Sequence, residues 1–159
     1  MTDHAVTFSR RFLLGTFGAA LLLPRRALHA ADGTTIEVYK SPSCGCCHLW
    51  VEHLEANGFA PKVQDMDDLS QVKMIAGVPE QLSACHTALV DGFVIEGHVP
   101  AAAIDRLLAE RPDIQGLAVP GMPAGSPGMP DPNPERYDVY AFRQGEAQVF
   151  MSFIETEVV

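Results

Sequence analysis

Long apolar segments are missing from this sequence of 159 residues. The apolar run near its start, residues 12–23, has twelve residues without charge, whereas a membrane-spanning helix needs about 20. This length argues against a stable membrane anchor. Cysteine is also scarce, because four cysteines are too few to build a disulfide-packed miniprotein of this size. Basic residues number 11 against 20 acidic ones, and the net charge of −9 argues against a nucleic-acid-binding surface.

The composition that remains is typical of one globular domain. Hydrophobic residues make up 47% of the chain and charged residues 19%, which is a balance that can form a packed core. The charge is unevenly divided along the chain. Residues 1–31 carry one acid and four arginines, a net charge of +3, while the rest carries 7 basic and 19 acidic residues, a net charge of −12. A basic leader on an acidic domain indicates a targeting peptide.

The basic N-terminal segment has the features of an export signal. Residues 9–14, with the sequence Ser-Arg-Arg-Phe-Leu-Leu, fit the twin-arginine pattern and precede the short apolar run. We predict a twin-arginine signal peptide at 1–31, cleaved after Ala30 or Ala31, and a mature domain at 32–159. The alternative is an amphipathic helix of a cytosolic protein, but the order of the charges favours export. The mature chain is therefore expected in a bacterial periplasm, without an anchor after cleavage.

Hydrophobic periodicity predicts a βαβαββα order, which is the thioredoxin-like arrangement. The expected strands cover residues 34–40, 59–66, 86–90 and 93–96, and the expected helices cover 47–57, a short stretch ending at 75, and 101–110. Residues 119–134 hold six prolines and three glycines and cannot form a regular element. Residues 137–142 and 148–153 alternate in polarity around Gly145 and predict an added C-terminal β-hairpin. The fold class is therefore α/β, with one Pro/Gly/Met-rich loop.

The segment Cys44-Gly45-Cys46-Cys47 is the strongest chemical signal in the chain. It lies where the first strand ends and the first helix begins, and unpaired N–H groups at a helix N-terminus favour the thiolate form. Three crowded thiolates suit a thiophilic metal, above all Cu(I). Cys44 and Cys47 alone would form a CxxC redox pair, so thiol chemistry remains an alternative. A purely structural disulfide is a third interpretation.

Further soft ligands follow the motif along the chain. If the predicted topology holds, Cys85 and His86 at the start of the third strand face the CxCC motif. His98 follows the fourth strand, and the methionines of the Pro/Gly loop have little core to fill. Alternatives are an inert buried Cys85, a surface His98 and methionines that only pack, while His48 and His53 are expected to face solvent. The predicted metal ligands are Cys44, Cys46, Cys47, Cys85, His86, His98, Met122 and Met129.

Two other uses of cysteine and histidine fit the spacing poorly. A structural zinc site usually takes two separated cysteine pairs in tetrahedral geometry, whereas this chain has one crowded motif and one distant cysteine. A catalytic cysteine–histidine nucleophile does not need three neighbouring thiols, and no hydrolase motif surrounds Cys47 or Cys85. Copper therefore remains the metal that the pattern favours.

These motifs together resemble the CopG-like copper-resistance proteins, a family of bacterial periplasmic proteins. The resemblance covers roughly residues 35–153 and rests on the sequence 39–47 with Trp50, on 85–87, on 96–100, on 116–123 and on 125–129. It implies a thioredoxin-like fold and a cysteine-bridged copper site that holds more than one ion. It also implies copper handling that includes interconversion of Cu(I) and Cu(II). The eight predicted ligands fall on cysteine, histidine and methionine positions of the family.

The leading hypothesis is a periplasmic copper-binding protein for copper resistance or homeostasis. Thiolates bind and bridge Cu(I), and imidazole and thioether groups complete a site that can also hold a Cu(I)/Cu(II) cluster. The alternative is a periplasmic thiol-disulfide oxidoreductase that uses Cys44 and Cys47, so the enzymatic role stays open between copper and thiol oxidoreduction. The expected partners are copper ions and other periplasmic copper-handling proteins. The acidic domain would bind a basic surface on such a protein.

Overall fold

The computed structural model describes residues 33–159 as eight strands and three α-helices with one short 3₁₀ helix. The predicted signal peptide, including its cleavage site, lies outside the described residues. The elements are, in chain order, β1 (Thr34–Lys40), α1 (Gly45–Ala56), β2 (Phe59–Asp65), α2 (Ser70–Ile75), η1 (Glu80–Leu82), β3 (His86–Val90), β4 (Phe93–Gly97), α3 (Ala101–Glu110), β5 (Gly116–Val119), β6 (Arg136–Arg143), β7 (Glu146–Ile154) and β8 (Glu157–Val158).

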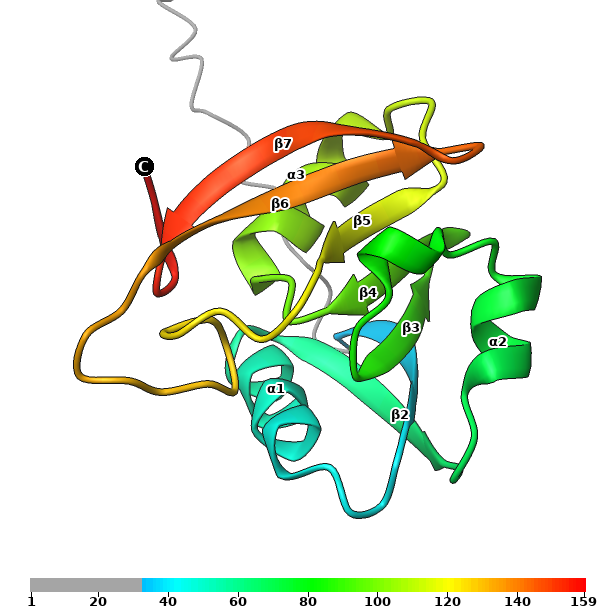
Figure 1. The fold of residues 1–159 in the computed structure, drawn as a ribbon, viewed down its shortest axis with the longest axis horizontal. Coiled ribbons are helices and arrows are strands. Elements are labelled where there is room, and N and C mark those ends of the chain that lie inside the picture. The colour runs from blue at the N-terminus through cyan, green and yellow to red at the C-terminus, as the bar shows by residue number, and fades with distance from the viewer. Residues whose placement is uncertain (1–32) are drawn as a thin grey trace, which may run out of the picture.

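All eight strands form one mixed sheet in the order β2-β1-β3-β4-β5-β6-β7-β8. The β1–β2 and β4–β5 pairs are parallel, and the other neighbouring pairs are antiparallel. Figure 1 shows β2 on one side of the molecule and the long β6–β7 hairpin on the other. The C-terminal hairpin is therefore a continuation of the same sheet, joined to it through β5.

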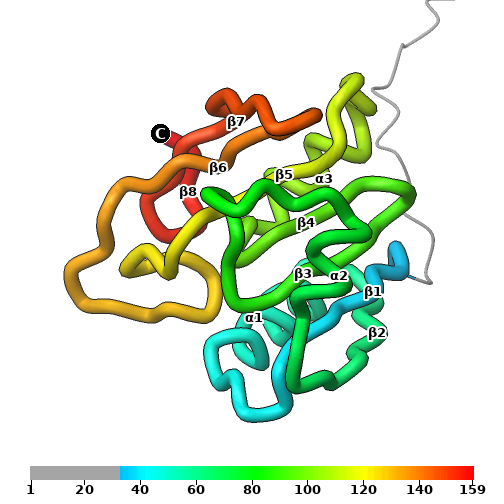
Figure 2. Tube along the Cα trace, turned by 45° about the vertical axis from the view of Figure 1, so that its right-hand side comes forward, coloured from blue at the N-terminus to red at the C-terminus, as the bar shows by residue number. Residues whose placement is uncertain are grey.

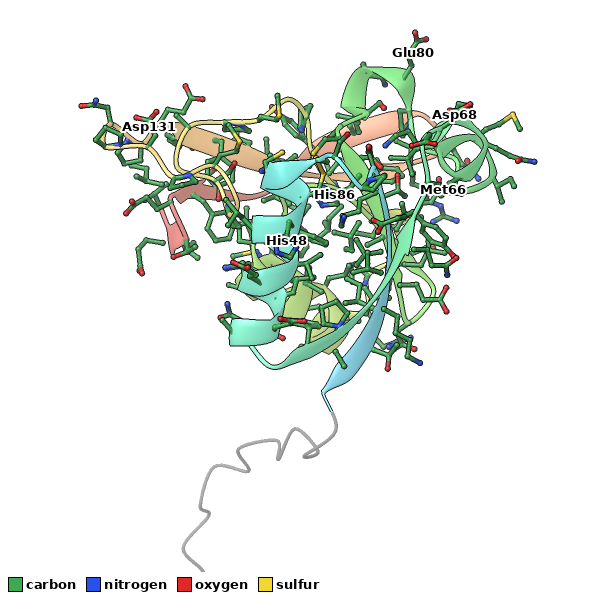
Figure 3. The ribbon with its side chains drawn as sticks, turned by 90° about the horizontal axis from the view of Figure 1, so that it is seen from below. His48, Met66, Asp68, Glu80, His86 and Asp131 are labelled. Atoms are coloured by element: carbon green, nitrogen blue, oxygen red, sulfur yellow. A yellow bond between two sulfur atoms is a disulfide. The ribbon has the colours of Figure 1, made fainter. Side chains whose placement is uncertain are left out.

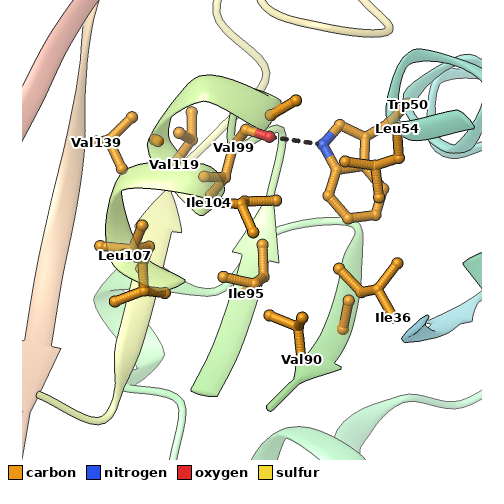
Figure 4. Close-up of a cluster of buried hydrophobic side chains, with 14 of the residues drawn as sticks. Ile36, Trp50, Leu54, Val90, Ile95, Val99, Ile104, Leu107, Val119 and Val139 are labelled. Carbon is orange, nitrogen blue, oxygen red and sulfur yellow. Dashed lines mark hydrogen bonds between the residues drawn. The ribbon is translucent and has the colours of Figure 1, made fainter. Parts of the chain in front are cut away.

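The two faces of the sheet pack against different helices, because side chains alternate along each strand. On β4, Ile95 belongs to the large hydrophobic cluster that contains α1 and α3, while Val94 belongs to a smaller cluster beside the end of α2. On β5, Leu117 likewise belongs to the larger cluster and Ala118 to the smaller one. Figure 4 shows the larger cluster, with the Trp50 indole donating a 2.9 Å hydrogen bond to the Val99 carbonyl.

Local sequence explains where the two long helices begin and face. α1 buries Cys47, Trp50, Val51 and Leu54, which recur at spacings of three and four along one side. α3 follows Pro100, its N-cap residue, whose extended backbone (φ −63°, ψ 145°) is typical of that position. Its first turn is bound by a side chain from α1, because Ala101 N donates a 3.0 Å hydrogen bond to His53 Nε2.

The predicted α/β class and the order of the first seven elements are confirmed. β1, β3 and α3 have the predicted bounds, whereas α1 begins at Gly45 rather than at Cys47. Two strands were not predicted, the four-residue β5 and the two-residue β8. Val119, which was expected to begin the irregular segment, is the last residue of β5. What the structure establishes is this mixed eight-stranded sheet, and the thioredoxin-like label stays a prediction.

The predicted irregular segment is present between β5 and β6. Figure 2 shows this loop leaving the sheet beside α1 before it returns to β6. At Gly128 the loop approaches α1 closely, since an added side-chain atom there would collide with the carbonyl oxygen of Cys46. Within residues 33–159, no helix has the length and apolar character needed to span a membrane.

Candidate metal centre

Three of the four cysteines surround the first turn of α1. Cys44 is the N-cap residue, and Cys46 and Cys47 occupy the second and third helical positions. Cys44 and Cys47 form a disulfide, with Cα atoms 5.4 Å apart, while Cys46 keeps a free thiol. This disulfide spans only three residues within one helical turn, so it joins no distant parts of the fold and does not support the purely structural interpretation.

Cys85 completes the cysteine group from the far side of the chain. It directly precedes β3, and its Sγ lies 3.9 Å from Cys46 Sγ. Cys46 Sγ in turn lies 3.5 Å from Cys44 Sγ, and Cys47 Sγ is 3.8 Å from the Cys85 carbonyl oxygen. All four sulfur atoms lie within 4.8 Å of one another, so the predicted convergence of Cys85 on the CxCC motif is found.

Two buried histidines extend the site beyond the cysteines. Cys85 Sγ lies 3.1 Å from His98 Nε2 and 3.3 Å from His86 Nδ1, so Cys85 belongs both to the cysteine group and to a Cys85–His86–His98 group. Figure 3 shows His86 beside the first turn of α1. The His86 ring lies 4.2 Å from Trp50 and 5.5 Å from His98 between centroids. His98 is fully buried, so the alternative of a surface histidine is wrong.

Burial keeps these groups uncharged. It raises the pKa of the Cys85 thiol to about 12, with a further contribution from Cys46. It also lowers the pKa of His98 to about 4, and it lowers the pKa of His86 well below its ordinary value, helped by the neighbouring His98 and Lys73. Neutral imidazoles carry the lone pair that a metal needs, and a thiol with a raised pKa gives up its proton when a cation binds it.

The Pro/Gly loop brings one methionine to the cluster. Met122 Sδ lies 3.9 Å from Cys46 Sγ, and the side chain is 55% exposed. Met129 is half-buried in the same loop, where its backbone donates a 2.7 Å hydrogen bond to the Ser126 carbonyl. The contact to the sulfur cluster is therefore found for Met122, while Met129 remains a predicted ligand.

The remaining predicted side chains divide between surface and core. His48 faces solvent as expected and lies 3.3 Å from Glu52. The expectation for His53 is wrong, because it is half-buried and accepts the hydrogen bond from α3 described above.

Comparison with known proteins finds one family model and two solved structures. The family described as "Protein of unknown function, DUF411" matches residues 82–129, a range that holds five of the eight predicted ligands. Two solved structures, "Copper resistance protein copG- Form 1" and "Copper resistance protein copG- Form 2", are each 45% identical to the chain with a TM-score of 0.72. Each alignment covers 77% of this chain and 99% of the other. No curated protein gives a significant match.

The chain belongs to the CopG family of copper resistance proteins. The resemblance read from the sequence is therefore confirmed at the level of the family. In this CopG-family chain the six cysteine and histidine ligands predicted from sequence lie in two overlapping groups that can hold metal.

Polar support for the CopG-family site comes from residues that sequence reasoning gave no role. Glu96 is fully buried and binds Lys73, Thr87 and the backbone of Ala84, next to Cys85. Burial raises the pKa of the Glu96 carboxyl, while Lys73 and these hydrogen bonds oppose that rise. The sequence does offer one sign of this role, a single carboxylate within the apolar strand 93–97. A buried charge needs partners.

A second supporting contact reaches His98 from the loop. Ser126 Oγ is buried 3.4 Å from His98 Nδ1 and donates its own hydrogen to the Pro123 carbonyl at 2.7 Å. The hydroxyl oxygen is thus free to accept a hydrogen bond from Nδ1–H. That tautomer leaves the Nε2 lone pair directed at Cys85, as a metal-ligating histidine requires.

Proposed function

We propose that this protein binds copper ions as cargo and serves copper resistance or homeostasis in the periplasm. The proposal rests chiefly on the convergence of four cysteine sulfur atoms with two histidines, since His98 Nε2 and His86 Nδ1 lie 3.1 Å and 3.3 Å from Cys85 Sγ. Sulfur and neutral imidazole donors gathered in one place suit a soft cation. The 45% identity to copper resistance proteins favours copper.

The donor set favours copper over harder ions. Thiolate and thioether sulfur are the ligands that select Cu(I), and imidazole binds both Cu(I) and Cu(II). The reduced chain would offer four thiols, two neutral imidazoles and the Met122 thioether at one end of the sheet. Because Cys85 belongs to both groups, its sulfur can bridge two ions, and the mixed donors can serve either oxidation state.

Anaerobic loading with Cu(I) followed by metal analysis tests this function. The reduced protein is expected to retain more than one copper ion per monomer, and X-ray absorption is expected to show mainly sulfur neighbours. A triple Cys44→Ser, Cys46→Ser, Cys47→Ser variant is expected to bind almost none. His48→Gln, an exposed histidine on the same helix, is the matched control and should bind as the native chain does. Unchanged stoichiometry in the triple variant would refute the proposal.

The second candidate, a thiol-disulfide oxidoreductase, is favoured by the Cys44–Cys47 disulfide at the start of α1. This function predicts disulfide reductase or isomerase activity in metal-free protein that survives Cys46→Ser. Such enzymes usually hold the substrate peptide against a cis-proline that precedes a threonine. In this chain His86 precedes Thr87, and residues 33–159 contain no cis peptide bond. Reductase activity without copper retention would favour this candidate over copper binding.

Twin-arginine export and delivery of copper to a partner belong to the same proposal. The basic leader supports export, and the net charge of −12 beyond residue 31 supports docking on a basic surface of another copper-handling protein. Periplasmic fractionation tests the first, and copper transfer measured at rising salt concentration tests the second.

A further inference from the structure

Glu96 is a buried carboxylate on the face of the sheet opposite α1. It shares its side of β4 with Val94, which packs in the smaller cluster, whereas Ile95 packs against α1 and α3. Figure 1 shows β3 and β4 lying between α1 and α2. Glu96 therefore lies across the sheet from the Cys44–Cys47 disulfide. Its hydrogen bonds nevertheless reach Ala84 and Thr87, the residues on either side of Cys85 and His86.

The contacts of Glu96 enclose the segment that carries Cys85 and His86. Glu96 Oε1 accepts a 2.6 Å hydrogen bond from Ala84 N, and Oε2 accepts a 2.7 Å hydrogen bond from Thr87 Oγ1. Ala84 and Thr87 directly flank the two predicted ligands. Lys73 of α2 pairs with the carboxylate and donates a 3.0 Å hydrogen bond to Thr87 Oγ1.

The segment before Cys85 depends on this side chain. Residues 83–85 lie outside any strand or helix, so no strand pairing holds the backbone of these three residues. Gly97 admits Ala84 closely, because an added side-chain atom at 97 would lie 2.6 Å from Ala84 Cβ. The carboxylate of the preceding residue can then reach the backbone of Ala84.

We propose that Glu96 is a positioning residue that holds Cys85 and His86 in place for copper. The proposal deepens the copper-binding function and rests on it. A buried ion pair is weak evidence for stability, because apolar side chains of similar volume often stabilise a protein equally well. Hydrogen bonds to both sides of a ligand pair instead determine where the Cys85 sulfur and the His86 ring lie. Partners behind the ligands of metal sites commonly act in this way.

Two variants of equal charge separate positioning from stability. Lys73→Met with Glu96→Gln removes the ion pair but keeps an acceptor for Ala84 N. Lys73→Met with Glu96→Leu also removes the ion pair but leaves no acceptor. Copper affinity, measured by competition with a chromogenic Cu(I) chelator, is expected to stay near the native value in the first and to fall about 10-fold to 100-fold in the second.

A copper-free measurement keeps this test independent of the proposed function. With Cys44→Ser and Cys47→Ser, the only remaining thiols are those of Cys46 and Cys85, and diamide can join them in a disulfide. In this background, the variant with Glu96→Gln is expected to cross-link as fast as the chain that keeps Lys73 and Glu96. The variant with Glu96→Leu is expected to cross-link much more slowly. If the native chain retained no copper while cross-linking behaved as expected, the copper function would fail and the positioning of Cys85 would stand.

Native copper affinity and native cross-linking in a folded Leu variant would overturn the proposal. Circular dichroism and thermal unfolding establish whether that variant is folded. If it is not, Thr87→Val decides, because it removes one contact to Glu96 with little change in volume. Slower cross-linking and weaker Cu(I) binding are expected there, and unchanged values in both would overturn the proposal equally.

Discussion

The Cys85 thiol faces the imidazole of His98, with Sγ 3.1 Å from Nε2. The same sulfur lies 3.9 Å from Cys46 Sγ, so Cys85 connects the cysteine group at α1 to the histidines at the ends of β3 and β4. Neither group keeps its full set of ligands without it. The roles of the surrounding residues can therefore be tested against the role of this one atom.

Replacing Cys85 should damage copper binding more than replacing any exposed ligand candidate. Cys85→Ser is expected to weaken Cu(I) binding by at least about tenfold, or about 1.4 kcal/mol, because the shared thiolate is lost from both groups. Titration against a chromogenic chelator measures the change. Native affinity and native copper content in Cys85→Ser would contradict a shared role for this sulfur.

The Met122 thioether should make a smaller contribution. Met122→Leu keeps most of the side-chain volume but removes the sulfur that lies 3.9 Å from Cys46. A loss of Cu(I) affinity is expected, smaller than the loss in Cys85→Ser, together with fewer sulfur neighbours in X-ray absorption. Met74→Leu is the control, because Met74 is also exposed but belongs to α2. Equal losses in the two variants would contradict ligation by Met122.

Copper uptake should depend on the oxidation state of Cys44 and Cys47. A disulfide removes two thiolates from the site, and thiolate is the form that binds metal. Protein carrying this disulfide is expected to take up less Cu(I) than protein treated with a phosphine reductant. Because diamide can also join Cys46 to Cys85, whose sulfur atoms lie 3.9 Å apart, peptide mapping must show that the oxidised sample carries only the Cys44–Cys47 bond. Equal uptake by oxidised and reduced native protein would refute this dependence.

Acid should destabilise the metal-free protein partly through His53. Burial lowers the pKa of His53 in the folded state, so the unfolded chain binds the proton more tightly. The stabilisation is complete above the unfolded pKa of about 6.5 and is lost as the pH falls through the folded value. Protonated His53 can no longer accept the hydrogen bond from Ala101, which contributes about 1 kcal/mol.

Urea unfolding at pH 7.5 and pH 5 measures this effect. His53→Gln retains an acceptor for Ala101 but cannot be protonated, so it should lose less stability on acidification than the native protein does. Other buried histidines titrate in both proteins, and the difference isolates His53. His48→Gln should behave like the native protein, since His48 is exposed. Identical pH dependence in native protein and His53→Gln would count against this role.

Export should depend on the paired arginines near the start of the chain. Arg10→Lys with Arg11→Lys is expected to keep the protein out of the periplasmic fraction, because the twin-arginine pattern is lost. Arg25→Lys with Arg26→Lys retains that pattern and should leave export unchanged. Immunoblots of periplasmic and cytoplasmic fractions distinguish the two, and periplasmic protein in the first variant would contradict this route.

Local patterns predicted most of the fold, and long-range pairing decided the rest. Alternation in β1 and the spacing of Trp50 and Leu54 in α1 are visible within a few residues of sequence. β5 has only four residues, all buried, and lies between β4 and β6. It therefore shows no alternation of polarity, and only its neighbours identify it as a strand.

The candidate site divides in the same way. The soft ligands could be found because cysteine, histidine and methionine are chemically distinctive and their places follow from the predicted order of elements. Glu96 could not be given a role, since its partners Lys73 and Ala84 come from separate segments whose approach depends on tertiary packing. The role of His53 was missed for the same reason, because its partner Ala101 lies 48 residues further along the chain.

The contact between Cys46 and Met122 joins residues that are 76 positions apart. During synthesis the three thiols of the CxCC motif are therefore made well before the loop that lies against them. At about 5 to 20 residues per second, the interval is about 4 to 15 s. A newly made chain thus carries these thiols without the loop for that time, and during it they depend on the reducing capacity of their surroundings.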